Sequence, residues 1–179
     1  MNVRCELRFG AYDTRRNLPP RSGRKRGEAN FLGAFIRAYM TRVQPPCVYG
    51  RQFAVPGCGV ADFVVSGSPS CDAETNGGSP RSLLAVETKL TDWKKALQQA
   101  YRYRYYANAA VVVLPHDRGS KALAATDVFQ RLGVGLWTFD ASSGVIQEHV
   151  AASAVDPLNP AKRDQALALI ERRIGNLRR

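Results

Sequence analysis

The sequence predicts an α/β protein, a three-layer α/β/α sandwich built around a mixed β-sheet. Three observations lead to this fold class. A helical pattern at 27–43 precedes two β-rich segments, a strand–helix–strand succession follows at 82–114, and a helix and a strand repeat that pattern near 121–139. Because 179 residues with 45% apolar content can bury one sizeable core, we expect a single folded domain.

The first helix is expected from about Gly27 to Val43. Apolar residues recur there at helical spacing and form one stripe, made of Phe31, Leu32, Phe35, Ile36, Tyr39, Met40 and Val43. Pro45 and Pro46 follow directly, and proline cannot continue a helix. The helix is therefore amphipathic and should pack one face on the sheet.

Two β-rich segments come next, Cys47 to Val55 and Val60 to Val65. The intervening segment 56–59 holds one proline and two glycines, residues that favour a turn, so the two segments are predicted to form an antiparallel hairpin. Ser66 to Arg81 is rich in glycine, serine and proline and is interpreted as a surface loop inserted between strands.

A strand covered on both faces is expected from Ser82 to Lys89, because it begins with a near-continuous apolar run. Asp92 can cap a helix from about Trp93 to Ala107, and Val111 to Leu114 is the next buried strand. These three elements predict a βαβ unit with parallel strands. The remaining expected elements are a helix near Lys121 to Arg131, a strand near Gly133 to Phe139, a strand at Val145 to Val150 and a helix from about Pro160.

The formal charge of +11 favours a polyanionic partner, because lysine and arginine neutralise phosphates and release counterions. Residues 1–26 are predicted to form a basic amino-terminal arm, and residues 27–179 a single domain. Arg24, Lys25 and Arg26 lie in a run that contains prolines and glycine but no acidic residue, and they are assigned to nucleic-acid binding. A solvated tail that serves only solubility is the open alternative.

Two further features concern location and cofactors. The longest apolar runs are far shorter than the ~20 residues of a membrane span, and the amino terminus carries charges where a secretion signal needs apolar residues. We therefore expect a soluble cytoplasmic protein with no membrane partner. The four cysteines show no C-x-x-C spacing and only two histidines accompany them, so we expect simple thiols and no structural metal or cluster.

Charged residues at the end of an apolar strand are the main chemical signal. Glu87 and Lys89 lie two apart, so they emerge on one face of the sheet, and Asp62 stands on the neighbouring predicted strand. Two carboxylates with the backbone carbonyl of Thr88 provide oxygen ligands for Mg²⁺, for which Mn²⁺ can substitute. Lys89 is then placed to orient the attacking water and help to deprotonate it.

The order of these motifs resembles the PD-(D/E)XK nuclease superfamily. A helix, an Asp-bearing strand, a Glu-x-Lys strand, a helix and a buried strand cover about Glu28 to Leu114. The resemblance implies a restriction-endonuclease-like fold and a magnesium-dependent phosphodiesterase, with Asp62, Glu87 and Lys89 as the catalytic residues. The 25-residue separation between Asp62 and Glu87 departs from the usual pattern and requires the loop at 66–81 as an insertion.

Three residues are assigned a supporting role. Gln99 and Tyr103 have the Q-x-x-x-Y spacing that is similar to RecB-like members of the superfamily, and residues four apart share a helical face. Two border residues of an ordinary amphipathic helix would show the same pattern. Glu28 lies on the apolar face of the first helix, where it adds a third carboxylate to the metal site or interacts with the helix dipole.

Aromatic and basic residues alternate in the same helix. Four tyrosines, at 101, 103, 105 and 106, are interleaved with Arg102 and Arg104. Such residues can stack on bases and contact phosphates, and Arg102 is assigned to nucleic-acid binding. Because the cluster encircles a helix, at least half of the tyrosines are expected to pack into the core.

The leading hypothesis is a metal-dependent nuclease acting on nucleic acid, with DNA as the expected substrate. The rival hypothesis is a noncatalytic nucleic-acid-binding module, and a third is a subunit of a larger nuclease or transposition complex. The sequence leaves open whether the chain acts alone, as a homodimer or in a larger assembly.

Overall fold

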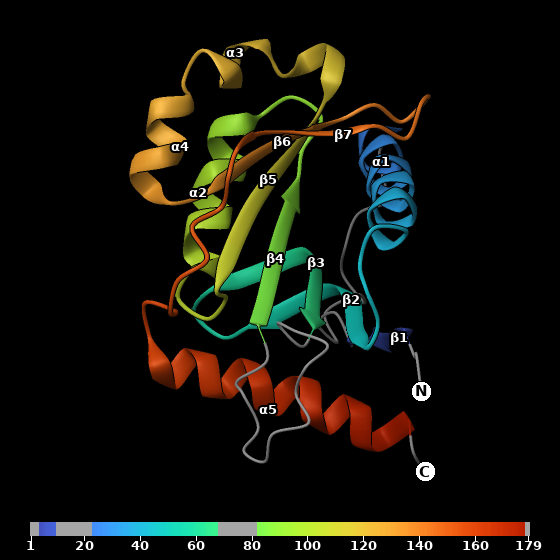
Figure 1. Cartoon of the computed structure of the whole chain (residues 1–179), viewed down its shortest axis with the longest axis vertical. Coiled ribbons are helices and arrows are strands. Elements are labelled where there is room, and N and C mark those ends of the chain that lie inside the picture. Colours follow the sequence, from blue (N-terminus) through green and yellow to red (C-terminus); the bar gives the residue numbers. More distant parts are fainter. Residues whose placement is uncertain (1–3, 10–22, 68–81, 178–179) are drawn as a thin grey trace.

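The computed structural model describes residues 4–9, 23–67 and 82–177 of the chain (Figure 1). Seven strands form one mixed sheet in the order of the sequence. The strands are β1 (Arg4–Arg8), β2 (Cys47–Val55), β3 (Gly59–Gly67), β4 (Ser82–Thr88), β5 (Ala109–Pro115), β6 (Gly135–Phe139) and β7 (Ile146–Val150). The pairs β1–β2, β4–β5 and β5–β6 are parallel, and the other neighbours are antiparallel.

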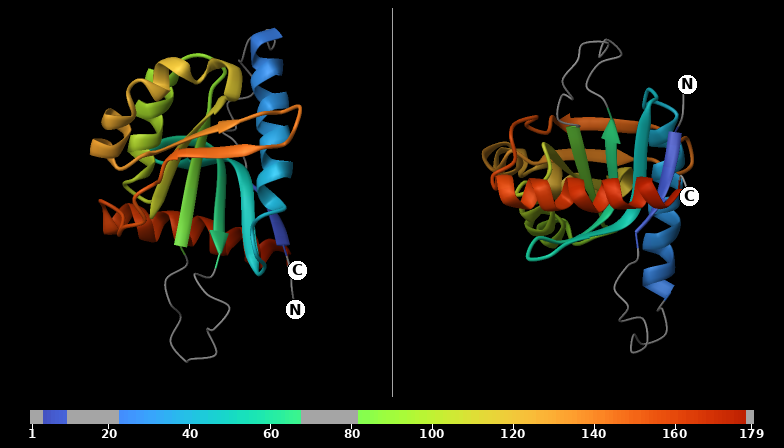
Figure 2. Two further views of the ribbon diagram at one scale, coloured as in Figure 1. Left: turned by 45° about the horizontal axis from the view of Figure 1, so that its top comes forward. Right: turned by 90° about the horizontal axis from the view of Figure 1, so that it is seen from below.

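Helices cover both faces of this sheet (Figure 2). Helix α1 (Gly23–Met40) covers one face, where the Phe35 ring lies 5.7 Å from the Phe139 ring and 6.5 Å from the Phe63 ring, centroid to centroid. The core on the other face includes buried residues of α2 (Trp93–Tyr103), α4 (Thr126–Leu132) and α5 (Pro160–Leu177). The chain therefore has a mixed α/β fold, as predicted.

The predicted hairpin and βαβ unit are both present. Strands β2 and β3 pair antiparallel, and Gly57 and Gly59 in the turn between them have the positive φ angles of 81° and 91° that glycine adopts easily. Asp92 caps α2 by accepting a hydrogen bond from the backbone N–H of Lys95 at 3.1 Å. Helix α2 then leads into β5, parallel to β4.

Strand β4 shows why its apolar run is nearly continuous. Leu83 and Ala85 are buried in the core on the α2 side, whereas Val86 is buried in the core on the α1 side. Both faces of the strand are thus covered, as a parallel strand of an α/β sheet requires. The same alternation directs Glu87 to the α2 side of the sheet.

The amino-terminal region differs from the predicted arm. Residues 4–8 form β1, which pairs with β2 at the edge of the sheet, and α1 begins at Gly23 instead of Gly27. Cys5 and Leu7 alternate with the charged Arg4, Glu6 and Arg8, the pattern of a strand with one covered face. Residues 10–22, most of the predicted arm, lie outside the described residues, as does most of the predicted loop at 66–81.

Three smaller boundaries also differ from the prediction. The helix expected near 121–131 is divided into α3 (Ser120–Leu123) and α4, and helix α2 ends at Tyr103 instead of Ala107. A 3-10 turn, His116–Arg118, joins β5 to α3. Across the described ranges, no helix combines the length and the apolar character that crossing a membrane requires.

Candidate active site

Asp62 lies where strands β3 and β4 part. The pairing of these strands ends at Phe63 and Val86. Beyond that point, the Asp62 carboxylate accepts a hydrogen bond from the backbone N–H of Thr88 on β4. Its Oδ2 atom accepts hydrogen bonds from the backbone N–H and the hydroxyl of Thr88, both at 2.9 Å. The carboxylate is thereby fixed beside the residue that follows Glu87.

Glu87 is the most buried acidic group of the site, with an exposed fraction of 1%. Burial raises its pKa to about 7, and the negative charge of Asp62 adds to this effect. Lys89 opposes the shift, because its Nζ atom lies 2.7 Å from Glu87 Oε1. The predicted proximity of Glu87 and Lys89 is therefore present, and Asp62 lies within electrostatic reach of both.

The Tyr103 hydroxyl links Glu87 to strand β3. It lies 2.6 Å from Glu87 Oε2 and 2.6 Å from the backbone carbonyl of Val60. A hydroxyl has one proton and a carbonyl only accepts, so both contacts are satisfied when Glu87 is protonated and donates to Tyr103. The raised pKa of Glu87 agrees with this arrangement of protons.

Lys89 follows the last residue of β4 and is a cation in this setting. Burial lowers its pKa, but the negative charges of Glu87, Asp62 and Glu28 outweigh that effect, and the pKa is raised overall. The ammonium group is therefore suited to orienting water and stabilising negative charge. The predicted help in deprotonating water requires the neutral amine and stays a prediction.

Glu28 contributes charge from the other side of the sheet. Helix α1 begins five residues earlier, so Glu28 is not in the first turn and the predicted interaction with the helix dipole does not arise. Among the described residues, no three His, Cys, Asp or Glu side chains gather into a metal-binding group, and a third ligand from Glu28 stays a prediction. The negative charge of Glu28 raises the pKa of Lys89.

Gln99 has an unsatisfied polar atom. Its Oε1 atom is buried and finds no hydrogen-bond partner among the described residues. Gln99 lies one helical turn before Tyr103, whose side chain reaches Glu87, so the two residues share the face of α2 that meets the site. A buried acceptor without a partner is costly unless a water or ligand satisfies it.

The structure describes the side chains of only some of the residues that are predicted to contact nucleic acid. Arg102 is exposed near the end of α2, next to the buried Tyr103. Tyr103 and Tyr106 are both fully buried, as expected for half of the tyrosine cluster. The backbone of Arg24, Lys25 and Arg26 belongs to α1, but their side chains lie outside the described residues.

Gln52 was not identified from the sequence. It lies on β2 opposite Asp62, and its side-chain N–H donates to Asp62 Oδ1 at 3.4 Å. Its φ angle of 56° is in the left-handed region, which is uncommon for a residue other than glycine. The predicted hairpin already places Gln52 opposite Asp62, and this position could have identified it from the sequence. Its backbone conformation has no signature in the sequence.

From the contact between Asp62 and Thr88 we predict an effect on the free energy of unfolding. Replacing Asp62 with alanine leaves the buried N–H and hydroxyl of Thr88 without their acceptor, so the free energy of unfolding should fall by about 1–3 kcal/mol. Asp62→Asn keeps an acceptor oxygen and should lose less. Urea unfolding measures both, with the exposed Asp117→Ala as the control. Equal stability of Asp62→Ala and the wild type would contradict this role.

Comparisons with known proteins provide no functional assignment. No family model matches the chain, and no curated protein matches it. Among solved structures, the chain is similar to SPO1766, a protein of unknown function from Silicibacter pomeroyi. The TM-score is 0.49 and the sequence identity 17%, over 84% of this chain and 88% of that one.

Proposed function

We propose that this chain is a metal-dependent nuclease of the PD-(D/E)XK type that hydrolyses phosphodiester bonds, with DNA as the expected substrate. The observation that carries the proposal is Glu87, a buried carboxylate held 2.7 Å from Lys89 and influenced by the charge of Asp62. Burying an acid beside a second acid costs stability, so this arrangement suggests a functional site. Helices on both faces of a mixed sheet support a restriction-endonuclease-like sandwich.

The donor set fits a hard divalent cation. Asp62 and Glu87 would hold Mg²⁺, with the backbone carbonyl of Thr88 as a further oxygen ligand. The unsatisfied Gln99 Oε1 atom offers an acceptor for an ordered water near the same helical face. Bound Mg²⁺ supplies positive charge that stabilises the charge developing on the phosphate.

The residues of the chain then have separate tasks. Lys89 would orient the attacking water by donating a hydrogen bond from its ammonium group, whose pKa the neighbouring carboxylates raise in the metal-free protein. Tyr103 holds Glu87 in place from α2, and Thr88 fixes Asp62 from β4. Binding of substrate is expected to depend on basic residues outside this cluster, because phosphate contacts dominate affinity for nucleic acid.

A cleavage assay tests the proposal. Purified wild-type protein with Mg²⁺ or Mn²⁺ should cleave at least one substrate among linear, circular, single-stranded and branched DNA and RNA, and EDTA should abolish the cleavage. Tight binding without cleavage of any of these substrates would favour the noncatalytic module instead.

A separate prediction concerns the basic residues at the start of α1. Replacing Arg24, Lys25 and Arg26 with glutamine should weaken nucleic-acid binding and reduce the slope of log K against log salt by about one unit for each phosphate that is no longer neutralised. Arg172 and Arg173, exposed on α5, provide a control that removes two positive charges elsewhere on the surface. An unchanged salt slope in the α1 variant would assign its basic run to solubility.

A further inference from the structure

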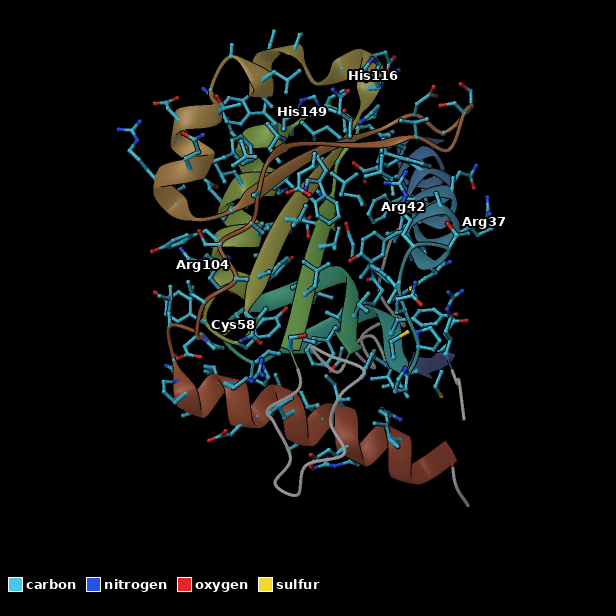
Figure 3. All side chains as sticks on the ribbon, viewed as in Figure 1. Arg37, Arg42, Cys58, Arg104, His116 and His149 are labelled. Atoms are coloured by element: carbon cyan, nitrogen blue, oxygen red, sulfur yellow. The ribbon has the colours of Figure 1, made fainter. Side chains whose placement is uncertain are left out.

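A second feature lies at the end of the sheet toward which β4 runs, away from α5 (Figure 1). A hollow of about 350 Å³ opens there, lined by Phe31, Pro115, His116, Asp117, Phe139, Asp140, Ala141 and Ser142. We call it the rim hollow. Apart from Phe31 on α1, its residues lie at or directly after the ends of β5 and β6, and Figure 3 shows His116 at this end of the molecule.

The rim hollow lies at the same end of the sheet as the candidate active site, on the α1 side, whereas Glu87 faces the α2 side. Thr88 pairs with Val113 across β4 and β5, and Pro115 is two residues further along β5. Strand spacing and rise then put the Cα atoms of Pro115 and Thr88 roughly 8 Å apart. Helix α1 also links the hollow to the site. Phe31, which lines the hollow, lies one helical turn after Glu28, whose charge raises the pKa of Lys89.

The lining combines an apolar floor with a polar rim. Phe31 and Phe139 are 7% and 2% exposed, and their ring centroids are 5.5 Å apart. On the rim, the Asp140 carboxylate accepts hydrogen bonds from the backbone N–H and the hydroxyl of Ser142 at 2.8 and 2.6 Å and from the Ser143 hydroxyl at 2.6 Å, which leaves part of its acceptor capacity free. Apolar walls with a few placed polar groups are typical of a small-ligand site.

The charge of the rim selects the part of a nucleotide that fits. The carboxylates of Asp117 and Asp140 disfavour a phosphate at the rim, although Arg118 Nε lies 3.5 Å from Asp117 Oδ2 and offsets part of that charge. The same carboxylates can accept hydrogen bonds from the amino groups at the edges of adenine, guanine or cytosine. The occupant consistent with this lining is therefore a nucleobase whose phosphate lies outside, toward Lys89.

We propose that the rim hollow binds an unpaired nucleobase beside the phosphodiester bond that is cleaved. The inference rests on the proposed nuclease function, and it names the substrate class as nucleic acid with an unpaired nucleotide at the cleavage site. A paired base reaches such a hollow only after unstacking and flipping, which costs a few kcal/mol. Single strands, ends and mismatches are therefore preferred over intact duplex.

Filling the rim hollow tests the proposal. Ala141 is exposed in the turn after β6, so Ala141→Trp can occupy the hollow without entering the core. Val145→Trp is the matched control, because Val145 is 55% exposed in the same turn and does not line the hollow. Binding is measured by fluorescence anisotropy in Ca²⁺, with a single-stranded oligonucleotide and an abasic one of equal length.

The wild type and Val145→Trp should bind the oligonucleotide with bases about 5- to 100-fold more tightly than the abasic one. Ala141→Trp should lose most of that preference. Equal preference in Ala141→Trp and Val145→Trp, or no binding of either oligonucleotide by the wild type, would overturn the base site.

Cleavage in Mg²⁺ is measured in parallel and separates the two proposals. Cleavage that is equal for both oligonucleotides and unaffected by Ala141→Trp would leave the nuclease proposal standing and reject the base site. A base preference that Ala141→Trp removes, without cleavage of any substrate, would reject the nuclease and support base binding alone.

Discussion

Cleavage of nucleic acid should fall by about 10³-fold or more in Glu87→Gln and in Lys89→Ala, while the affinity for substrate changes only a few-fold. Glu87 is proposed to hold the cation and Lys89 to orient the water, so either change removes several kcal/mol of transition-state stabilisation. Affinity depends on many phosphate contacts, and these remain. Single-turnover cleavage and anisotropy binding measure the two quantities.

The matched control for Lys89→Ala is Lys94→Ala. Lys94 is exposed on α2 and makes no contact with Glu87 among the described residues. Lys94→Ala therefore removes one positive charge that lies outside the site. Lys94→Ala should cleave within a few-fold of the wild type. Undiminished cleavage by Glu87→Gln would exclude this carboxylate from the chemistry.

The second large effect is a pH-dependent gain in stability from Glu87→Gln. The pKa of Glu87 is raised by burial from 4.5 to about 7 in the folded protein, so the unfolded chain loses its proton first as the pH rises. Stability is thus lost progressively between pH 4.5 and 7. The difference in unfolding free energy between Glu87→Gln and the wild type should grow in favour of the variant by about 3 kcal/mol over this range.

Glutamine suits this test because it copies the protonated acid. Its amide N–H can donate to the Tyr103 hydroxyl, which then donates to the Val60 carbonyl. Urea unfolding at several pH values measures the difference, with the exposed Glu171→Gln as the control. A difference that stays constant from about pH 4.5 to 8 would show that Glu87 is already ionised in the folded protein at low pH.

The candidate site was predictable where local patterns determine it. Glu87 near the end of a buried strand and Lys89 directly after it lie two residues apart, a spacing that places both side chains on one side and allows their 2.7 Å contact. Gln99 and Tyr103 share a face because they are one helical turn apart. Short-range periodicity therefore accounts for most of the predicted cluster.

The remaining features depend on tertiary contacts. The Tyr103 bond to the Val60 carbonyl and the Asp62 bond to Thr88 join residues 43 and 26 positions apart, so no local pattern predicts them. Strand β1 was missed because its five residues are mostly charged and its partner β2 is distant in sequence. The amino-terminal extent of α1 was missed because glycine and prolines precede it.

X-ray diffraction from crystals soaked in Mn²⁺ shows which side chains bind the cation. We expect an anomalous peak about 2–2.6 Å from carboxylate oxygens of both Asp62 and Glu87, and its loss in Asp62→Asn. A peak elsewhere in the wild type, or none at Mn²⁺ concentrations that support cleavage, would contradict the proposed site.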